Sequence, residues 1–217
     1  MKHLLLTAHF AFLLSIAASA AKVKDTKFKH GRGFFDVPFE EVITTETPGA
    51  TIICTLDGSD PRRSENTVIG TSPLTVAIDP DNITKRPKTP CVIVRAYAKK
   101  AGLDETNVDT QTYIFIESVK RQDSASPGGG WPVGDRINRQ VMIYGMNQSV
   151  INDPRWKDKI SDALKAIPSM SLVASLDDWF DPSDGLYANP REQGKKTEIP
   201  GSLELINPDG KEGFQVN

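Results

Sequence analysis

The sequence predicts a mainly β protein in which an antiparallel β-sandwich precedes a small α+β unit. Between residues 28 and 115, short runs of β-branched and aromatic residues alternate with turn residues, a pattern typical of sandwiches. No helical period of useful length interrupts these runs, and parallel pairing would need long crossovers that the segment lacks. Near residue 122 the composition shifts, and a helical pattern appears only beyond that point. We therefore expect two parts of different class.

Residues 1–20 have the pattern of a secretory signal peptide. A positive start, Met1-Lys2-His3, precedes an apolar run that ends at Ala17, and Ala18-Ser19-Ala20 forms a small-residue cleavage site. The run is shorter than the about 20 apolar residues that a membrane span needs. We therefore expect cleavage after Ala20 and a mature chain that is secreted or held in the cell envelope, without an integral membrane span.

The mature chain offers few groups for metal binding or acid–base chemistry. His3 and His9 leave with the signal peptide, so His30 is the one histidine that remains. It lies in a glycine-containing segment without a nearby nucleophile motif, and we expect a solvated loop histidine. The formal net charge of −2 gives no basic surface for nucleic acid. The sequence therefore indicates no enzyme, no cofactor, no metal site and no nucleic-acid partner.

Five β-type runs define the predicted sandwich, and tight turns rich in Gly, Pro and Asp separate them. The runs cover residues 41–45, 50–56, 74–78, 92–98 and 110–116. Alternation along the runs predicts six residues that point into the core: Val42, Ile52, Leu56, Leu74, Val94 and Tyr113.

The turn Asp57-Gly58-Ser59-Asp60 has two interpretations. Its carboxylates and hydroxyl could bind calcium, but an EF-hand-type loop needs further ligands and a distal Glu that are absent. An Asp-Gly turn instead uses the Asp side chain for a bond to the backbone and the Gly for positive φ. We favour the structural turn.

Cys54 and Cys91 are the two cysteines of the chain. An oxidising compartment would permit a disulfide between them. However, strand parity places Cys54 on the face of Ala50 and Ile52, whereas Cys91 alternates away from Val92. A disulfide and two separate thiols therefore both remain open, and the parity favours the thiols.

Composition divides the chain into a signal peptide (1–20), a sandwich (27–118), a Gly/Ser/Pro linker (119–131) and a partial α+β region (132–217). Gly128-Gly129-Gly130 lacks the Lys-Ser/Thr of a phosphate loop, so it is interpreted as part of the linker.

The α+β region contains one predicted helix and a few strands. Asp153 caps the helix, Pro154 begins it, and the helix ends near Ala166, with apolar residues at near-helical spacing: Trp156, Ile160, Leu164 and Ile167. Strands are expected at 171–174 and 202–206, and the turn at 207–210 returns a strand at 214–216. We expect this unit to be incomplete and to derive from a longer protein.

The sandwich segment carries a specific motif. It comprises residues 49–61, GATIICTLDGSDP, followed by residues 94–98, VRAYA, and by Gly102. This motif resembles the chitobiase/β-hexosaminidase C-terminal-type module, also called the fibronectin-III-associated domain, although Cys54 replaces the characteristic aromatic of that family. The resemblance implies an immunoglobulin-like sandwich that serves as an accessory unit in secreted, often carbohydrate-active, proteins.

The region after the linker resembles the start of the CotH-like spore-coat kinase family. The similar segments are WP at 131–132, YGMN at 144–147, AL at 163–164, IPSMSLV at 167–173, GLYANP at 185–190 and ELINPDG at 204–210. The chain departs from this family at residues 196–200 and ends before its catalytic motifs, so no kinase residue is carried over. The resemblance implies a bacterial source.

Two further groups of residues are candidates for function. Asp177, Asp178, Asp181 and Asp184, alone or with Glu198 and Glu204, could hold a cation or form the carboxylate pair of a glycosidase, but a solvated acidic loop is the favoured interpretation. Tyr97 alternates outward from Val94 and Ala96, which makes it the best candidate for stacking on a sugar, although a packed tyrosine is favoured over this role.

Three hypotheses follow from the sequence. The leading one is an exported, non-catalytic accessory or spacer module of a bacterial envelope or secreted protein, associated with carbohydrate, whose partners are glycans or cell-envelope components. The alternatives are a carbohydrate-binding module and a truncated N-terminal part of a CotH-like kinase protein.

Overall fold

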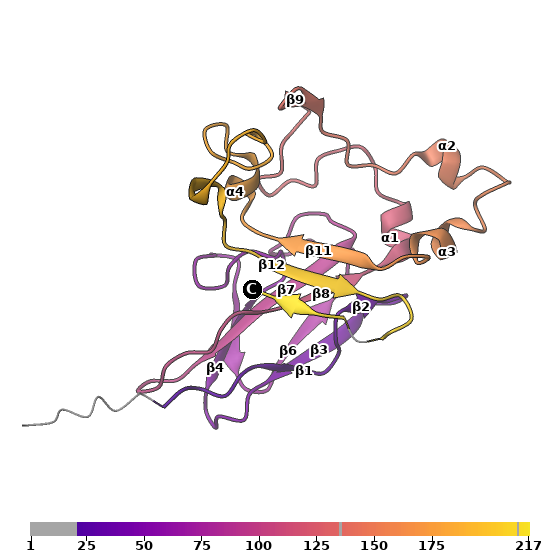
Figure 1. Ribbon diagram of the computed structural model, residues 1–217. Coiled ribbons are helices and arrows are strands. Elements are labelled where there is room, and N and C mark those ends of the chain that lie inside the picture. The colour runs from indigo at the N-terminus through magenta and orange to yellow at the C-terminus, as the bar shows by residue number, and fades with distance from the viewer. Residues whose placement is uncertain (1–20, 135, 212) are drawn as a thin grey trace, which may run out of the picture.

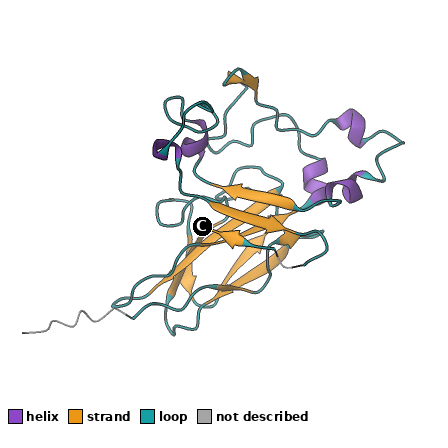
Figure 2. Cartoon of the chain, in the orientation of Figure 1, coloured by secondary structure: helices purple, strands orange, loops and turns teal. Residues whose placement is uncertain are grey.

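The computed structural model describes residues 21–134, 136–211 and 213–217 (Figure 1). The predicted signal peptide lies outside the described residues. The chain is mainly β, as predicted, with a few short helices (Figure 2). These helices follow the sandwich strands in the sequence. Within the described residues, no helix has both the length and the apolar character that crossing a bilayer requires.

Two sheets form the sandwich. The first has the order β1-β3-β6, with β1 at Lys27–Phe28, β3 at Phe39–Thr44 and β6 at Leu74–Ile78. The second has the order β2-β8-β7-β4-β5, with β2 at Gly33–Phe34, β8 at Asp109–Ile114, β7 at Cys91–Lys99, β4 at Thr51–Thr55 and β5 at Val68–Thr71. The pairing of β2 with β8 is parallel, and the other pairs of the sandwich are antiparallel.

All five predicted runs form strands. The run 74–78 coincides with β6, and the ends of the others shift by one or two residues. The sequence pattern does not predict β1, β2 or β5, because strands of two to four residues are too short to show a period.

The sandwich core agrees with the prediction except in β3. Ile52, Val94 and Tyr113 are fully buried, and Leu56 and Leu74 pack against the core. The inward position predicted for Val42 is wrong, because Ile43 is the buried core residue. The alternation of β3 is set by Glu41, which also points inward and is fully buried.

A third layer covers the outer face of the five-stranded sheet. It is the antiparallel sheet β11-β12-β13, formed by Ser169–Val173, Ser202–Ile206 and Gln215–Val216. These strands lie beside β7 and β8 in Figure 1. Ile206 of β12 packs in one buried cluster with Ile114 and Ile116, at the end of β8. The strands expected in the C-terminal part therefore form, and they pack on the sandwich.

The predicted helix at 153–166 is wrong in its length. Only α3, Ile160–Leu164, is helical there, and the preceding residues form turns. Asp153 accepts a hydrogen bond from the backbone N–H of Arg155 instead of capping a helix. Leu164 packs against the cluster of Ile114, Ile116 and Ile206, whereas Trp156 and Ile167 are exposed, so packing stabilises only part of the apolar stripe that predicted the helix.

The remaining elements are short. They are α1 at Ile116–Lys120, β9 at Arg136–Ile137, β10 at Gln140–Val141, α2 at Gln148–Ile151, α4 at Leu176–Phe180 and a 3₁₀ turn at Lys195–Thr197.

The Gly/Ser/Pro segment at 119–131 lies against the sandwich. The backbone N–H of Lys88 donates to the carbonyl of Pro127 at 3.1 Å, and Gly129 lies beside Pro87. At Gly145 a Cβ atom would come within 2.7 Å of the Asp123 backbone, so only glycine permits this approach. The composition predicted a chain that does not pack, whereas the described segment makes specific backbone contacts.

Cys54 and Cys91 are free thiols, so the disulfide alternative is not realised. Cys54 of β4 is opposite Ala96 of β7, and Cys91 lies on β7 five positions before Ala96. At about 3.3 Å per residue this separation is about 16 Å, whereas a disulfide needs Cα atoms within about 7 Å. As the parity predicted, Cys54 lies in the sandwich core and Cys91 packs in the cluster on the outer face.

Candidate functional site

A buried carboxylate joins the third layer to the sandwich. Glu204 of β12 is fully buried and accepts hydrogen bonds from the backbone N–H of Thr112 at 3.3 Å and from its hydroxyl at 2.5 Å. Because the Thr112 hydroxyl donates its proton to Glu204, it accepts from the hydroxyl of Ser171 at 2.7 Å. Burial raises the pKa of Glu204, and the Thr112 hydrogen bonds and the Arg32 charge oppose this shift.

Arg32 binds the same carboxylate from the segment before β2. Its Nε lies 3.2 Å from Glu204 Oε1, and its Nη2 donates to Gln215 Oε1 at 3.0 Å. The backbone N–H of Arg32 donates to the Gln111 side chain at 2.7 Å. One segment near the N-terminus thus holds strands from both ends of the chain together.

His30, two residues earlier, occupies a similar position against β3. Its Nδ1 lies 3.0 Å from Glu41 Oε2, and its backbone N–H also donates to that carboxylate. The imidazole packs edge-on against Phe39 with ring centroids 4.7 Å apart. The expected solvated loop histidine is therefore wrong, because Glu41 and the phenylalanine rings hold the side chain partly buried.

Tyr113 is close enough to both glutamates for their charges to act on its phenol. Its hydroxyl donates to the carbonyl of His30 at 3.1 Å. Burial raises the pKa of Tyr113, and the negative charges of Glu41 and Glu204 raise it further. The phenol is therefore protonated at neutral pH and serves as a hydrogen-bond donor.

Residues Asp57 to Asp60 form a turn that also contacts the third layer. Asp57 Oδ1 accepts from the backbone N–H of Ser59 at 3.0 Å and from its hydroxyl, and Gly58 has a φ of +80°. A Cβ atom at Gly58 would lie 3.2 Å from Val173 and 3.3 Å from Ile93. This geometry is that of the structural turn favoured from the sequence, and the glycine is needed both for φ and for the close approach of β11.

Tyr97 alternates away from the core, as expected, but its ring is not exposed. It is 6% exposed and packs with Ile53 and Val108. The guanidinium of Arg62 lies over the ring at 5.1 Å from its centroid. The Nε of Arg62 donates a hydrogen bond to Glu105 Oε1 at 2.6 Å. Tyr97 is therefore the packed tyrosine that the sequence favoured, and Arg62 covers the ring face that the alternative, sugar stacking, would need.

The acidic residues at 177–184 do not converge with the glutamates. The backbone N–H of Asp178 donates to the Ser175 hydroxyl, which caps α4. The carboxylate of Asp181 accepts a hydrogen bond from the backbone N–H of Ser183. Glu198 is exposed, whereas Glu204 is buried against Thr112. Across the described residues, no group of three or more His, Cys, Asp or Glu side chains is placed to hold a metal ion.

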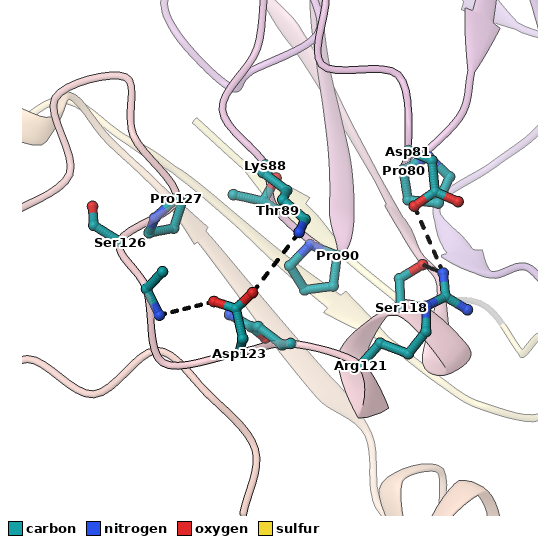
Figure 3. Close-up of a pocket in the computed structure, with 12 residues that line it drawn as sticks. Pro80, Asp81, Lys88, Thr89, Pro90, Ser118, Arg121, Asp123, Ser126 and Pro127 are labelled. Atoms are coloured by element: carbon teal, nitrogen blue, oxygen red, sulfur yellow. Dashed lines mark hydrogen bonds and ion pairs between the residues drawn. The ribbon is translucent and has the colours of Figure 1, made fainter. Parts of the chain in front are cut away.

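A pocket of about 390 Å³ lies where the 119–131 segment meets the sandwich (Figure 3). Its walls come from the loop between β6 and β7 and from the chain after α1. Two charged pairs span it: Arg121 Nη2 lies 3.7 Å from Asp81, and Lys88 Nζ lies 3.8 Å from Asp123. Its volume is in the range of small-molecule sites, which is about 300–1,000 Å³.

Arg86 organises one wall of this pocket from inside the loop. Its guanidinium donates to the backbone carbonyls of Pro80, Thr89 and Cys91 at 2.7–3.0 Å. Burial lowers the pKa of Arg86, and these carbonyl dipoles supply the polar contacts that the buried cation needs. The loop therefore presents Pro80, Asp81 and Lys88 from a fixed backbone.

The comparisons with known proteins support the interpretation of the sandwich. A family model described as "Fn3 associated" matches residues 42–113, which run from β3 to β8. This match supports a fibronectin-III-associated module, a family that suggests an accessory role. No curated protein and no solved structure matches the chain. The matched segment does not extend into residues 114–217, and no comparison supports the CotH-like resemblance of that region.

Sequence reasoning missed the residues that hold the layers together. Arg32 lies in a short glycine-flanked segment, and Glu41 and Glu204 carry charges that normally lie at the surface. The available signal was parity, because Glu204 alternates with Leu203 and Leu205 and therefore shares a face with Ile206.

Proposed function

We propose that this chain is an exported, non-catalytic accessory or spacer module of a bacterial envelope or secreted protein, associated with carbohydrate. The match to the fibronectin-III-associated family supports the accessory role. The signal-peptide pattern of residues 1–20 supports export. The association with carbohydrate and the bacterial source rest on the two family resemblances of the sequence.

The contact between Glu204 and Thr112 is the observation that carries this proposal. A spacer must keep a fixed orientation between its ends. Here strands from the C-terminal part pack on the sandwich through a buried, ion-paired carboxylate. Breaking such a buried pair is costly, so the two parts are expected to move as one body.

The non-catalytic part of the proposal is supported by how the acidic groups are used. The carboxylate of Glu204 is committed to Arg32 and Thr112, and that of Glu41 to His30. A glycosidase needs two carboxylates facing one cleft at a set separation. These two glutamates are instead buried in separate contacts.

Two experiments on the mature chain test the proposal. Incubation with chitin-type and other glycans should give no hydrolysis products, and turnover that survives repurification would overturn the non-catalytic role. NMR relaxation should give one rotational correlation time for the sandwich and the third layer. Two distinct correlation times would contradict the rigid spacer.

A carbohydrate-binding module is the second candidate, and the pocket of Figure 3 favours it. Its charged and hydroxyl groups could hydrogen-bond a polyol without an aromatic platform. The test is retention of the mature chain on insoluble glycans. Arg121→Ala and Lys88→Ala should weaken retention, whereas Arg155→Ala, which changes an exposed arginine elsewhere, should not. Equal retention of all variants would exclude this pocket.

The third alternative, a truncated CotH-like kinase protein, has no support from the comparisons. It is tested by the genomic reading frame. Continuation past Asn217 into nucleotide-binding and catalytic motifs would favour this alternative.

A further inference from the structure

Arg95 of β7 has a cationic side chain without a partner in the described part of the chain. Its Nε is shielded from solvent and makes no hydrogen bond, and no described carboxylate forms an ion pair with it. Burial lowers the pKa of Arg95, and the charges of Asp60 and Arg62 act on it with opposite signs. The side chain of Arg95 is only partly buried, but its buried Nε–H lacks an acceptor, which is costly, so this atom calls for an acceptor such as an anion.

Two hydroxyl groups on the same side of the sheet also lack partners. Thr110 of β8 and Ser202 of β12 are both fully buried, and neither hydroxyl oxygen has a hydrogen-bond partner among residues 21–134, 136–211 and 213–217. Buried polar groups are nearly always paired, and each exception needs an explanation such as an ion or a water.

The register of β7 and β8 brings two of these side chains together. Arg95 is directly opposite Thr110 in the β7–β8 ladder, so the two side chains leave the same face of the sheet. That face is the outer one, because the alternating residues Val94 and Ala96 are in the sandwich core.

The third layer then places Ser202 over Thr110. Glu204 bonds to Thr112, and Ile206 packs with Ile114, so β12 follows β8 residue by residue in steps of two. If this order continues for one further step along both strands, Ser202 faces Thr110. At the next position Asn217 Nδ2 donates to the carbonyl of Val108 at 2.9 Å, which closes this end of the interface.

The geometry points to a small, monovalent inorganic anion of the chloride class, bound between the sandwich and the third layer by Arg95 Nε and the hydroxyls of Thr110 and Ser202. All three groups can donate a hydrogen bond to one acceptor. The carboxylate of Asp60 acts on Arg95 through its charge but forms no ion pair with it, and its Oδ1 accepts the backbone N–H of Arg62. The hydroxyls are enclosed, so an anion with a bulky substituent would not fit.

The site predicts that chloride stabilises the folded chain. A ligand that binds only the folded state raises stability with the logarithm of its concentration once it exceeds its dissociation constant. Thermal unfolding of the mature chain is measured in mixtures of sodium chloride and sodium gluconate at one ionic strength, which removes general screening. The melting temperature should rise with the chloride fraction in the wild type.

Variants and a direct probe make the test decisive. Arg95→Gln and Ser202→Ala should lose the chloride-dependent rise, whereas Arg155→Gln, which removes an exposed arginine elsewhere, should keep it. In crystals grown in sodium bromide, an anomalous peak should lie between Arg95, Thr110 and Ser202. Water density without an anomalous peak, or an unchanged chloride response in Arg95→Gln, would overturn the proposal. The crystal test uses the wild type, so it decides the question even if the variants do not fold.

Discussion

The buried carboxylate of Glu204 accepts hydrogen bonds from both the backbone N–H and the hydroxyl of Thr112, which lies 92 positions earlier in the chain. This contact connects the last strand of the sandwich with the sheet at the C-terminal end. It explains how two segments of different composition form one packed body. The stability of that body should therefore depend on this contact and on the groups around it.

Replacing Glu204 should destabilise the chain strongly. Glu204→Ala leaves Arg32 and the Thr112 N–H without their partner, and breaking one side of a buried pair costs about 3–5 kcal/mol. The matched control is Glu198→Ala, an exposed glutamate whose loss should cost less than about 0.5 kcal/mol. Urea unfolding gives both values. A similar, small change in the two variants would show that the third layer is not held by Glu204.

The stability contribution of Glu204 should fall as pH rises. Its folded-state pKa lies above the ordinary value of 4.5, so the folded chain binds the proton more tightly than the unfolded chain. The contribution is complete below the unfolded pKa and is lost as pH rises through the raised folded pKa. Glu204→Gln resembles the protonated form and lacks this loss.

The measurement is the difference in unfolding free energy between Glu204→Gln and the wild type, from about pH 4 to about pH 7. As pH rises, the free energy of unfolding of Glu204→Gln should increase relative to that of the wild type. Asp109, whose pKa burial also raises, is present in both proteins and cancels in the comparison. If the wild type instead gained stability relative to Glu204→Gln as pH rises, the pKa of Glu204 would be lowered in the folded chain.

The fold was predicted from the sequence where alternation and turn residues were long enough to read. The core strands β4, β6, β7 and β8 were found, and the turn at Asp57 was interpreted from its residue types. The helix at 153–166 was overpredicted, because a periodic apolar stripe shows only the capacity to pack and here Trp156 stays exposed.

Parity places Glu204 on one face with Ile206, but its partners across the interface could not be predicted from the pattern. It depends on polar residues, Arg32, Thr112 and Glu204, that are distant in sequence and that composition assigns to the surface. Which buried charges pair with each other is fixed only when the strands have been placed in space. For the same reason the inward position of Glu41, and with it the parity of β3, was missed.

Gly58 should tolerate substitution less well than a matched glycine. Gly58 and Gly102 have nearly equal positive φ values, +80° and +79°, so alanine at either position carries the left-handed backbone cost of about 1–3 kcal/mol. Only at Gly58 would the new Cβ press on Val173 and Ile93. Denaturant unfolding should therefore show a larger loss for Gly58→Ala than for Gly102→Ala. Equal losses would mean that β11 shifts to accommodate the new Cβ atom without a cost in stability.

Both thiols should be unreactive in the folded chain. Burial raises the pKa of Cys54 to about 12 and that of Cys91 to about 11, and the thiolate is the reactive form. Iodoacetamide at about pH 8 should therefore label both cysteines only after unfolding. A peptide map of the mature chain without reductant should show no bridge between them. Rapid labelling of the native chain, or a bridged peptide, would contradict the positions of these residues.

The backbone N–H of Thr112 points away from β7 and toward the third layer. Ile93 is opposite Thr112 in the β7–β8 ladder, and its carbonyl accepts from the N–H of Gly58 on the other side of β7. The two residues therefore form a pair without ladder hydrogen bonds, and the Thr112 N–H donates to Glu204. Its protection from exchange reports the contact between the layers.

Amide hydrogen exchange of Thr112 is thus the most direct test of the docking of the third layer. In the mature chain, NMR should show Thr112 protected to a degree comparable with the core residue Val94. Glu204→Ala should remove this protection while Val94 stays protected. Fast exchange at Thr112 in the wild type, with Val94 still protected, would show that the third layer does not pack on the sandwich.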